Sequence, residues 1–201
     1  MLIRKKLKSK DLIIAFSNDN YLSTSEIKKC KYTKNSSRYF DWIQGRSALK
    51  KVFEHLNKSI DVTKISFPNE YFSISHTKDC AVAIGILNNC ESSNGVGIDL
   101  ELSRKVDAKH TRYYLSKYES DLVNSNDDLL RLWTVKEALF KADPNNDGVI
   151  LKYYNVKNPK TLKGEAINKK GDTFYYNSIK NPADKFLGEK RGGWMSWAIS
   201  K

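Results

Sequence analysis

The chain has 201 residues, of which 40% are hydrophobic and 29% are charged. This mixture is typical of a globular protein with one large domain or two small ones, and it excludes disordered and fibrous classes. No apolar run approaches the ~18–20 residues of a membrane-spanning helix, so we expect a cytoplasmic protein with no membrane partner. A formal net charge of +12 favours polyanionic partners, such as nucleic acid, phosphorylated ligands or an acidic protein.

The three cysteines, Cys30, Cys80 and Cys90, include no C-x-x-C pair. An odd number without that spacing predicts neither a disulfide framework nor a zinc site. We therefore expect three reduced side chains.

The first part of the chain contains signals for a strand and two helices. The apolar run Leu12–Phe16 predicts a strand. Ser23 and Glu26 have the spacing of a capping box, which predicts the start of a short helix. Residues 38–56 place apolar side chains three and four positions apart, which predicts a long amphipathic helix.

A hairpin and a further strand are predicted next. Residues 71–75 and 81–87 alternate or run apolar around a polar segment, as the two strands of a hairpin do. Residues 88–94 are polar and predict a turn, and residues 95–102 predict another strand.

The second half of the chain repeats this plan. Residues 129–142 predict a helix, and residues 152–156, 173–179 and 194–199 predict strands separated by Gly, Pro and Asn turns.

The two predicted long helices also resemble each other. Trp42 precedes Ala48-Leu49 in the first, and Trp133 precedes Ala138-Leu139 in the second, at nearly the same spacing. We therefore expect an α+β fold of two pseudo-symmetric halves, each a small, mostly antiparallel sheet packed with helices. The halves would be residues 1–95 and 96–201, and a cleft between them would be a natural ligand site.

The predicted strand at 95–102 carries two carboxylates on one face. Because strand side chains alternate, Asp99 and Glu101 point away from the side of Ile98 and Leu100. Adjacent carboxylates repel each other, and a divalent metal ion would remove that cost. The alternative is a solvent-facing strand with two exposed charges.

Two further charged groups lie on the predicted helix 129–142. Glu137 and Lys141 are four residues apart and share a helix face with Trp133. Taken alone, the pair is typical of an exposed ion pair. His76 follows Ser73-Ile74-Ser75 at a strand end, where a histidine alone is more often a surface residue.

Together these segments resemble one family. Ser73-Ile74-Ser75-His76, Gly97–Glu101 and Trp133–Lys141, in this order, are similar to the signature of the 4′-phosphopantetheinyl transferase superfamily. Gly45-Arg46 resembles the family's Gly-Arg helix. The resemblance covers about residues 38–141, and the chain length resembles the larger, single-chain, surfactin-synthetase-activating type.

The resemblance implies an activity and a metal site. Coenzyme A would lie in the cleft between the halves and donate its 4′-phosphopantetheine arm to a serine of an acidic apo acyl or peptidyl carrier protein, releasing 3′,5′-ADP. Asp99, Glu101 and Glu137 would hold Mg²⁺, or Mn²⁺ in its place, against the pyrophosphate. Glu137 would also take the serine proton, and Lys141 would stabilise the phosphate. We expect a monomer.

The resemblance also implies residues that bind coenzyme A. These are Arg46, His76 and Lys136, with Arg46 making a bidentate phosphate contact. The chain departs from the family at Ser66-Phe67-Pro68, where many members have Gly-Lys-Pro.

Two other functions stay open. The positive charge and the 4 Trp, 11 Tyr and 8 Phe would suit a nucleic-acid-binding protein. We expect no nucleic-acid partner, because the carboxylates stand where such a groove needs cations. The second alternative is an inactive relative that binds carrier proteins, which the intact Asp99, Glu101, Glu137 and Lys141 oppose.

Overall fold

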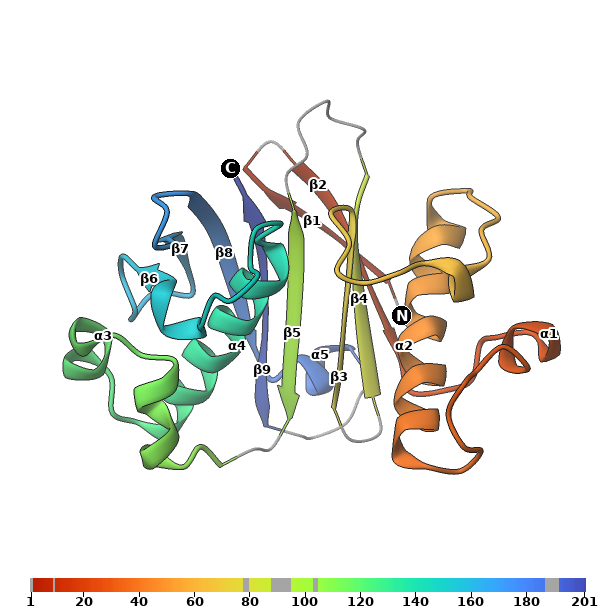
Figure 1. The fold of residues 1–201 in the computed structure, drawn as a ribbon, viewed down its shortest axis with the longest axis horizontal. Helices are drawn as coiled ribbons and strands as arrows, with labels where there is room; N and C mark the ends of the chain where they lie inside the picture. The colour runs from red at the N-terminus through yellow and green to blue at the C-terminus, as the bar shows by residue number, and fades with distance from the viewer. Residues whose placement is uncertain (1, 9, 78–79, 88–94, 103–104, 187–191) are drawn as a thin grey trace.

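The computed structural model describes the whole chain except residues 1, 9, 78–79, 88–94, 103–104 and 187–191. The predicted turn at 88–94, the tip of the predicted hairpin and Cys90 lie outside the described residues. Cys30 and Cys80 are not joined in a disulfide. The structure has two antiparallel sheets with helices (Figure 1), which confirms the expected α+β class and the antiparallel sheets.

The first sheet has the strand order β1-β2-β4-β3. Its strands are β1 (Leu2–Leu7), β2 (Lys10–Ser17), β3 (Phe72–Thr77) and β4 (Cys80–Ile86). The helices of this part are α1 (Thr24–Ile27), α2 (Ser37–His55) and a 3₁₀ turn at Val62–Lys64.

The second sheet has the strand order β5-β9-β8-β7-β6. Its strands are β5 (Val96–Leu102), β6 (Asn155–Val156), β7 (Lys163–Ile167), β8 (Thr173–Lys180) and β9 (Gly193–Ser200). The helices are α3 (Lys117–Leu122), α4 (Asn126–Ala142), α5 (Pro182–Phe186) and 3₁₀ turns at Ala108–Tyr113 and Leu151–Tyr153.

The two sheets pack face to face, and each has one long helix on its outer face. Alternate residues of β2 and β4, such as Ile14 and Val82, share a buried core with Ile98 and Trp197 of the second sheet. The opposite face of the first sheet packs on α2, and that of the second sheet packs on α4. In Figure 1, β5, β3 and β4 accordingly lie between α4 and α2.

The structure corrects the prediction in several places. Only Asn155-Val156 of the predicted strand 152–156 is a strand, because the chain before it forms a 3₁₀ turn. Tyr154 is fully buried there, and its hydroxyl donates to Asp143. The elements β1, β7, α3 and α5 were not predicted.

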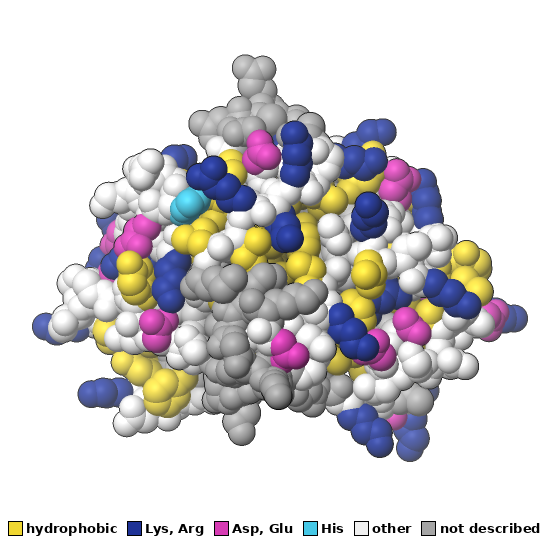
Figure 2. Space-filling model, turned by 180° about the vertical axis from the view of Figure 1, so that it is seen from behind, with side chains coloured by type: hydrophobic (Ala, Val, Ile, Leu, Met, Phe, Trp, Pro, Cys, Tyr) yellow, Lys and Arg dark blue, Asp and Glu magenta, His cyan; other side chains and the backbone are white. Residues whose placement is uncertain are grey.

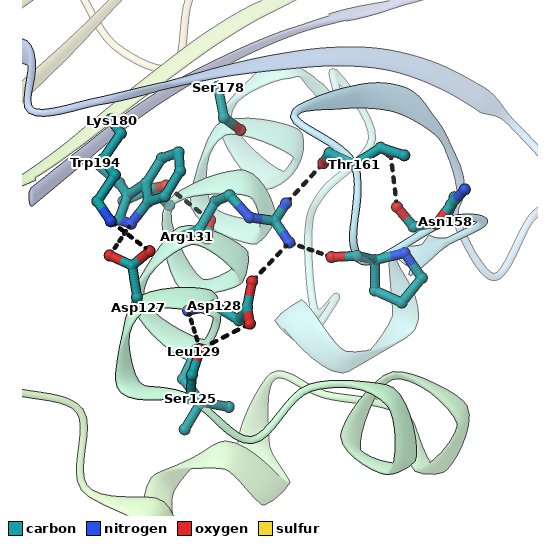
Figure 3. Close-up of polar contacts among 12 residues, drawn as sticks. Ser125, Asp127, Asp128, Leu129, Arg131, Asn158, Thr161, Ser178, Lys180 and Trp194 are labelled. Carbon is teal, nitrogen blue, oxygen red and sulfur yellow. Dashed lines mark hydrogen bonds and ion pairs between the residues drawn. The ribbon is translucent and has the colours of Figure 1, made fainter.

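A buried arginine ties the start of α4 to the segment after β6. Arg131 is 1% exposed, and its guanidinium donates to the carbonyl oxygens of Pro159 and Thr161 (Figure 3). It also lies 3.6 Å from Asp128 and over the ring of Trp194. A buried cation needs hydrogen-bond partners for its donors. These contacts therefore fix the first turns of α4 against the segment that follows β6.

The edge strands β3 and β5 meet along a seam. The backbone N–H groups of Ile98 and Leu100 donate to the hydroxyl oxygens of Ser73 and Ser75, each at 3.2 Å. Side-chain hydroxyls thus accept hydrogen bonds that a neighbouring strand would otherwise accept.

Among the described residues, no helix has the length and hydropathy needed to cross a bilayer.

Candidate active site

Two glycines bring α4 close to β5. A Cβ at Gly97 would lie 1.9 Å from the carbonyl oxygen of Ala138, and one at Gly95 would lie 2.2 Å from that of Ala142. Only glycine allows this close approach of helix and strand backbones. Because strand side chains alternate, Asp99 and Glu101 continue the face that starts with the two glycines, and they point toward α4.

Asp99 is the most buried of the predicted site carboxylates. It is 5% exposed, and its Oδ1 accepts from Ser75 Oγ at 2.8 Å and from Lys141 Nζ at 2.7 Å. Lys141 also donates to the carbonyl oxygen of Ile98 at 3.2 Å. Asp99 Oδ2 is buried and has no hydrogen-bond partner within the described part of the chain. An unsatisfied buried carboxylate oxygen is costly, so it indicates a missing donor or cation.

The other two carboxylates flank this centre. Trp133 Nε1 donates to Glu101 Oε1 at 3.1 Å. Trp133, Glu137 and Lys141 occupy successive turns of one face of α4. Since Trp133 contacts Glu101 and Lys141 contacts Asp99, the intervening Glu137 faces the same strand. The structure therefore gathers the four predicted residues on one β5–α4 surface.

The donor chemistry of this surface fits a magnesium ion. In the residues that the structure describes, no three His, Cys, Asp or Glu side chains enclose a metal position. However, Mg²⁺ prefers oxygen ligands, and in proteins it usually keeps several waters and takes phosphate oxygens rather than being caged by side chains. The unpartnered Oδ2 of Asp99, with Glu101 and Glu137 nearby, provides such ligands.

Arg46 and His76 line one cavity of about 480 Å³. Arg46 Nη1 donates to the carbonyl oxygen of Val62 at 2.6 Å, and its guanidinium lies 5.9 Å from the ring of Trp42 and 5.1 Å from that of Phe67. Burial lowers the pKa of Arg46, but a guanidinium stays protonated in proteins. His76 is exposed, and its Nε2 lies 3.6 Å from Asp41.

Phe67 is a cavity residue that sequence reasoning missed. It belongs to the segment that departs from the family pattern, so no motif indicated it. A second cavity of about 370 Å³ shares Phe67 and Ile74 with the first and also includes Lys141. The Arg46 cavity and the Lys141 cavity therefore adjoin at these two side chains.

A cavity of about 670 Å³, larger than these two, lies elsewhere, beside α1 and the end of α2. Four of its charged residues bind one another, since Lys29 pairs with Asp61 and Lys50 pairs with Glu26. Size alone therefore does not make it the candidate site, and its charges are less available for a ligand.

Lys136 does not fit its expected role in binding coenzyme A. Its side chain is fully buried and pairs with Glu119 at 2.7 Å, and its Nζ also donates to the carbonyl oxygen of Tyr154. Burial lowers the pKa of Lys136, and the nearby Glu119 carboxylate opposes that shift. The motif spacing includes Lys136, but helix geometry turns it away from Glu137 and into the core.

Comparison with known proteins finds a similarity in the C-terminal part of the chain. The family model of the 4′-phosphopantetheinyl transferase superfamily matches residues 95–187. No curated protein matches the chain. The matched range includes Asp99, Glu101, Glu137 and Lys141 and excludes Arg46 and His76. Residues 95–187 are thus similar to the superfamily that the sequence motifs indicate.

Proposed function

We propose that the protein transfers the 4′-phosphopantetheine arm of coenzyme A to a serine of an apo acyl or peptidyl carrier protein and releases 3′,5′-ADP. The observation that carries this proposal is the buried Oδ2 of Asp99, which lies beside Lys141 and has no hydrogen-bond partner among the described residues. Both residues lie in the range that matches the superfamily. The chain would be the larger, single-chain type, with residues 1–95 and 96–201 as its two related halves.

Coenzyme A would bind along the two adjoining cavities. The cationic and aromatic cavity of Arg46, Trp42 and His76 suits a phosphorylated adenosine, because a guanidinium recognises phosphate and aromatic rings stack on bases. The second cavity extends from Phe67 to Lys141. The pyrophosphate would then reach Lys141 and the carboxylates of β5.

The reaction exchanges one phosphate ester for another. The serine oxygen would attack the phosphorus that carries the pantetheine arm, and the bond from that phosphorus to 3′,5′-ADP would break. Glu137 would accept the serine proton, directly or through a water molecule. Lys141, held by Asp99, would offset negative charge on the phosphate.

Asp99, Glu101 and Glu137 would hold Mg²⁺, or Mn²⁺ in its place. The bound ion would neutralise charge on the pyrophosphate as the leaving group departs.

The surface charge supports an acidic protein partner. Figure 2 shows Lys and Arg side chains spread over the described parts of the viewed face, with Asp and Glu side chains among them, and the chain has a net charge of +12. Such a field accelerates encounter with an acidic carrier protein.

Mass spectrometry tests the proposal directly. The protein is incubated with CoA, Mg²⁺ and apo carrier proteins from fatty-acid, polyketide and nonribosomal peptide synthesis. We expect at least one carrier to gain the mass of one phosphopantetheine group, and none to do so with Asp99→Ala or without CoA. Carrier binding without modification would favour the inactive relative. Tight, salt-dependent binding of nucleic acid without carrier modification would favour the nucleic-acid-binding alternative.

A further inference from the structure

The seam between β3 and β5 contains two serines in equivalent positions. Ser73 and Ser75 are both about 95% buried, and each accepts one backbone N–H group of β5. They differ in one contact. Ser75 Oγ also lies 2.8 Å from Asp99 Oδ1, whereas Ser73 makes no hydrogen bond to Asp99 in the described structure.

The two hydrogen bonds of Ser75 show where its hydroxyl proton points. The N–H group of Leu100 can only donate, so Ser75 Oγ accepts that bond with a lone pair. The single hydroxyl proton of Ser75 is therefore directed at Asp99 Oδ1. The acceptor is a carboxylate, which makes this a charge-assisted bond between the two sheets.

Ser75 and Lys141 together saturate one oxygen of Asp99. Ser75 approaches from β3 and Lys141 from α4, and both donate to Oδ1. A carboxylate rotates readily about its Cβ–Cγ bond, and these two donors hold it in one orientation. The orientation leaves Oδ2 buried and without a partner among the described atoms.

We propose that Ser75 is a positioning residue, which orients Asp99 so that Oδ2 is presented to a divalent cation. This inference rests on the proposed function, in which Asp99 binds the metal ion. Groups that orient a ligand commonly change metal affinity about 10–100-fold when removed. Ser75 itself would touch neither the metal ion nor the substrate.

The matched pair Ser75→Ala and Ser73→Ala tests the inference. Each variant loses one seam hydrogen bond, but only Ser75→Ala loses the bond to Asp99. Mn²⁺ is titrated into each full-length variant in the presence of saturating CoA, without carrier protein, and free Mn²⁺ is measured by electron paramagnetic resonance. We expect Ser75→Ala to weaken Mn²⁺ binding about 10-fold or more and Ser73→Ala to weaken it less than about 3-fold.

A kinetic measurement gives an independent reading. The Mg²⁺ concentration for half-maximal activity should rise in Ser75→Ala, while the KM for CoA stays near that of the unmodified protein. If Ser75→Ala is unstable, Ser75→Cys retains most of the side-chain volume but is a weak donor, and the same loss of Mn²⁺ affinity is expected.

The outcomes separate this inference from the proposed function. Equal Mn²⁺ affinities in the Ser75 and Ser73 variants, with binding lost in Asp99→Ala, would overturn the role of Ser75 alone. Unchanged Mn²⁺ affinity in Asp99→Ala would overturn the metal assignment on which both proposals rest.

Discussion

The short helices α1 and α3 both begin with a capping box. In α1, Ser23 accepts from the backbone of Glu26, and Glu26 accepts from the backbone of Ser23. Ser116 and Glu119 form the same capping box at the start of α3. Each box satisfies helix-terminal N–H groups that would otherwise lack partners.

The two glutamates differ in what surrounds them. Glu26 pairs with Lys50 of α2 at 2.7 Å, and the two side chains are 11% and 24% exposed. Glu119 pairs with Lys136 of α4 at the same distance, and both side chains are fully buried. The same capping signal thus leads to two different ion pairs, because the Lys50 side chain is partly exposed to water whereas both side chains of the second pair are fully buried.

Breaking the buried pair should produce the largest effect. Lys136→Ala leaves the Glu119 carboxylate buried without its cation, and we expect the free energy of unfolding to fall by about 3–5 kcal/mol. Lys50→Ala, the matched variant, should cost less than about 1 kcal/mol, because Lys50 is partly exposed and Glu26 keeps its hydrogen bonds from Ser23. Urea denaturation followed by circular dichroism measures both. Similar losses in the two variants would contradict the role assigned to burial.

The elements on the two sides of the β3–β5 seam also present different polar groups. The helix α2 and the strand β3 contribute the Arg46 guanidinium and the His76 imidazole to an aromatic cavity. The strand β5 and the helix α4 contribute carboxylates. The first arrangement suits a phosphate, and the second suits a cation. Substitutions in the two places should therefore change different kinetic properties of the protein.

Substituting the carboxylates should lower the rate of carrier modification. We expect Asp99→Ala, Glu101→Ala and Glu137→Ala each to lower carrier modification about 10²–10³-fold, or roughly 3–4 kcal/mol in the barrier. Each variant should stay folded by circular dichroism, and excess EDTA should abolish activity in the unmodified protein. Full activity in EDTA, or in one of the variants, would remove the corresponding ligand from the assignment.

Substituting Arg46 should change the preference of the protein for CoA over dephospho-CoA as the donor of the arm. A bidentate phosphate contact contributes about 1.5–3 kcal/mol, so Arg46→Ala should weaken use of CoA tens-fold. Dephospho-CoA, which lacks the 3′-phosphate, should be a poor donor for the unmodified protein. The variant should lose most of that preference, measured as a ratio of kcat/KM values.

Arg38→Ala is the matched control, since Arg38 lines the same cavity but is exposed. If Arg46→Ala discriminates between the donors as strongly as the unmodified protein, Arg46 serves only to hold Val62 and the phosphate contact lies elsewhere.

The smallest effect should come from salt. Raising the ionic strength shortens the Debye length to ~8 Å at physiological salt, so screening should raise the KM for carrier protein a few-fold. The KM for CoA should change less, because its contacts are partly buried. Steady-state kinetics at low and high salt measure both constants, and a salt-independent KM for carrier would argue against electrostatic steering.

Elements with a clear apolar pattern were predictable from the sequence. The strands β2 and β5 and the helices α2 and α4 match the predictions, because β2 is a continuous apolar run buried on both faces and the other three have apolar residues at strand or helix spacing. β1 was missed because basic residues interrupt its apolar pattern, which suits a free sheet edge. The 3₁₀ turn before β6 was read as a strand because its aromatic residues have high strand propensity.

For the candidate site, the sequence by itself determined which residues share a face. The alternation along β5 places Asp99 beside Glu101, and the four-residue spacing on α4 aligns Glu137 with Lys141, because side-chain periodicity is a local property of the backbone. Only the tertiary structure decided that Lys136 lies in the core, that Phe67 lines the Arg46 cavity and that Ser75 donates to Asp99. These contacts join elements that are distant in the chain, and their partners are set by how the two sheets and their helices pack, which no local spacing encodes.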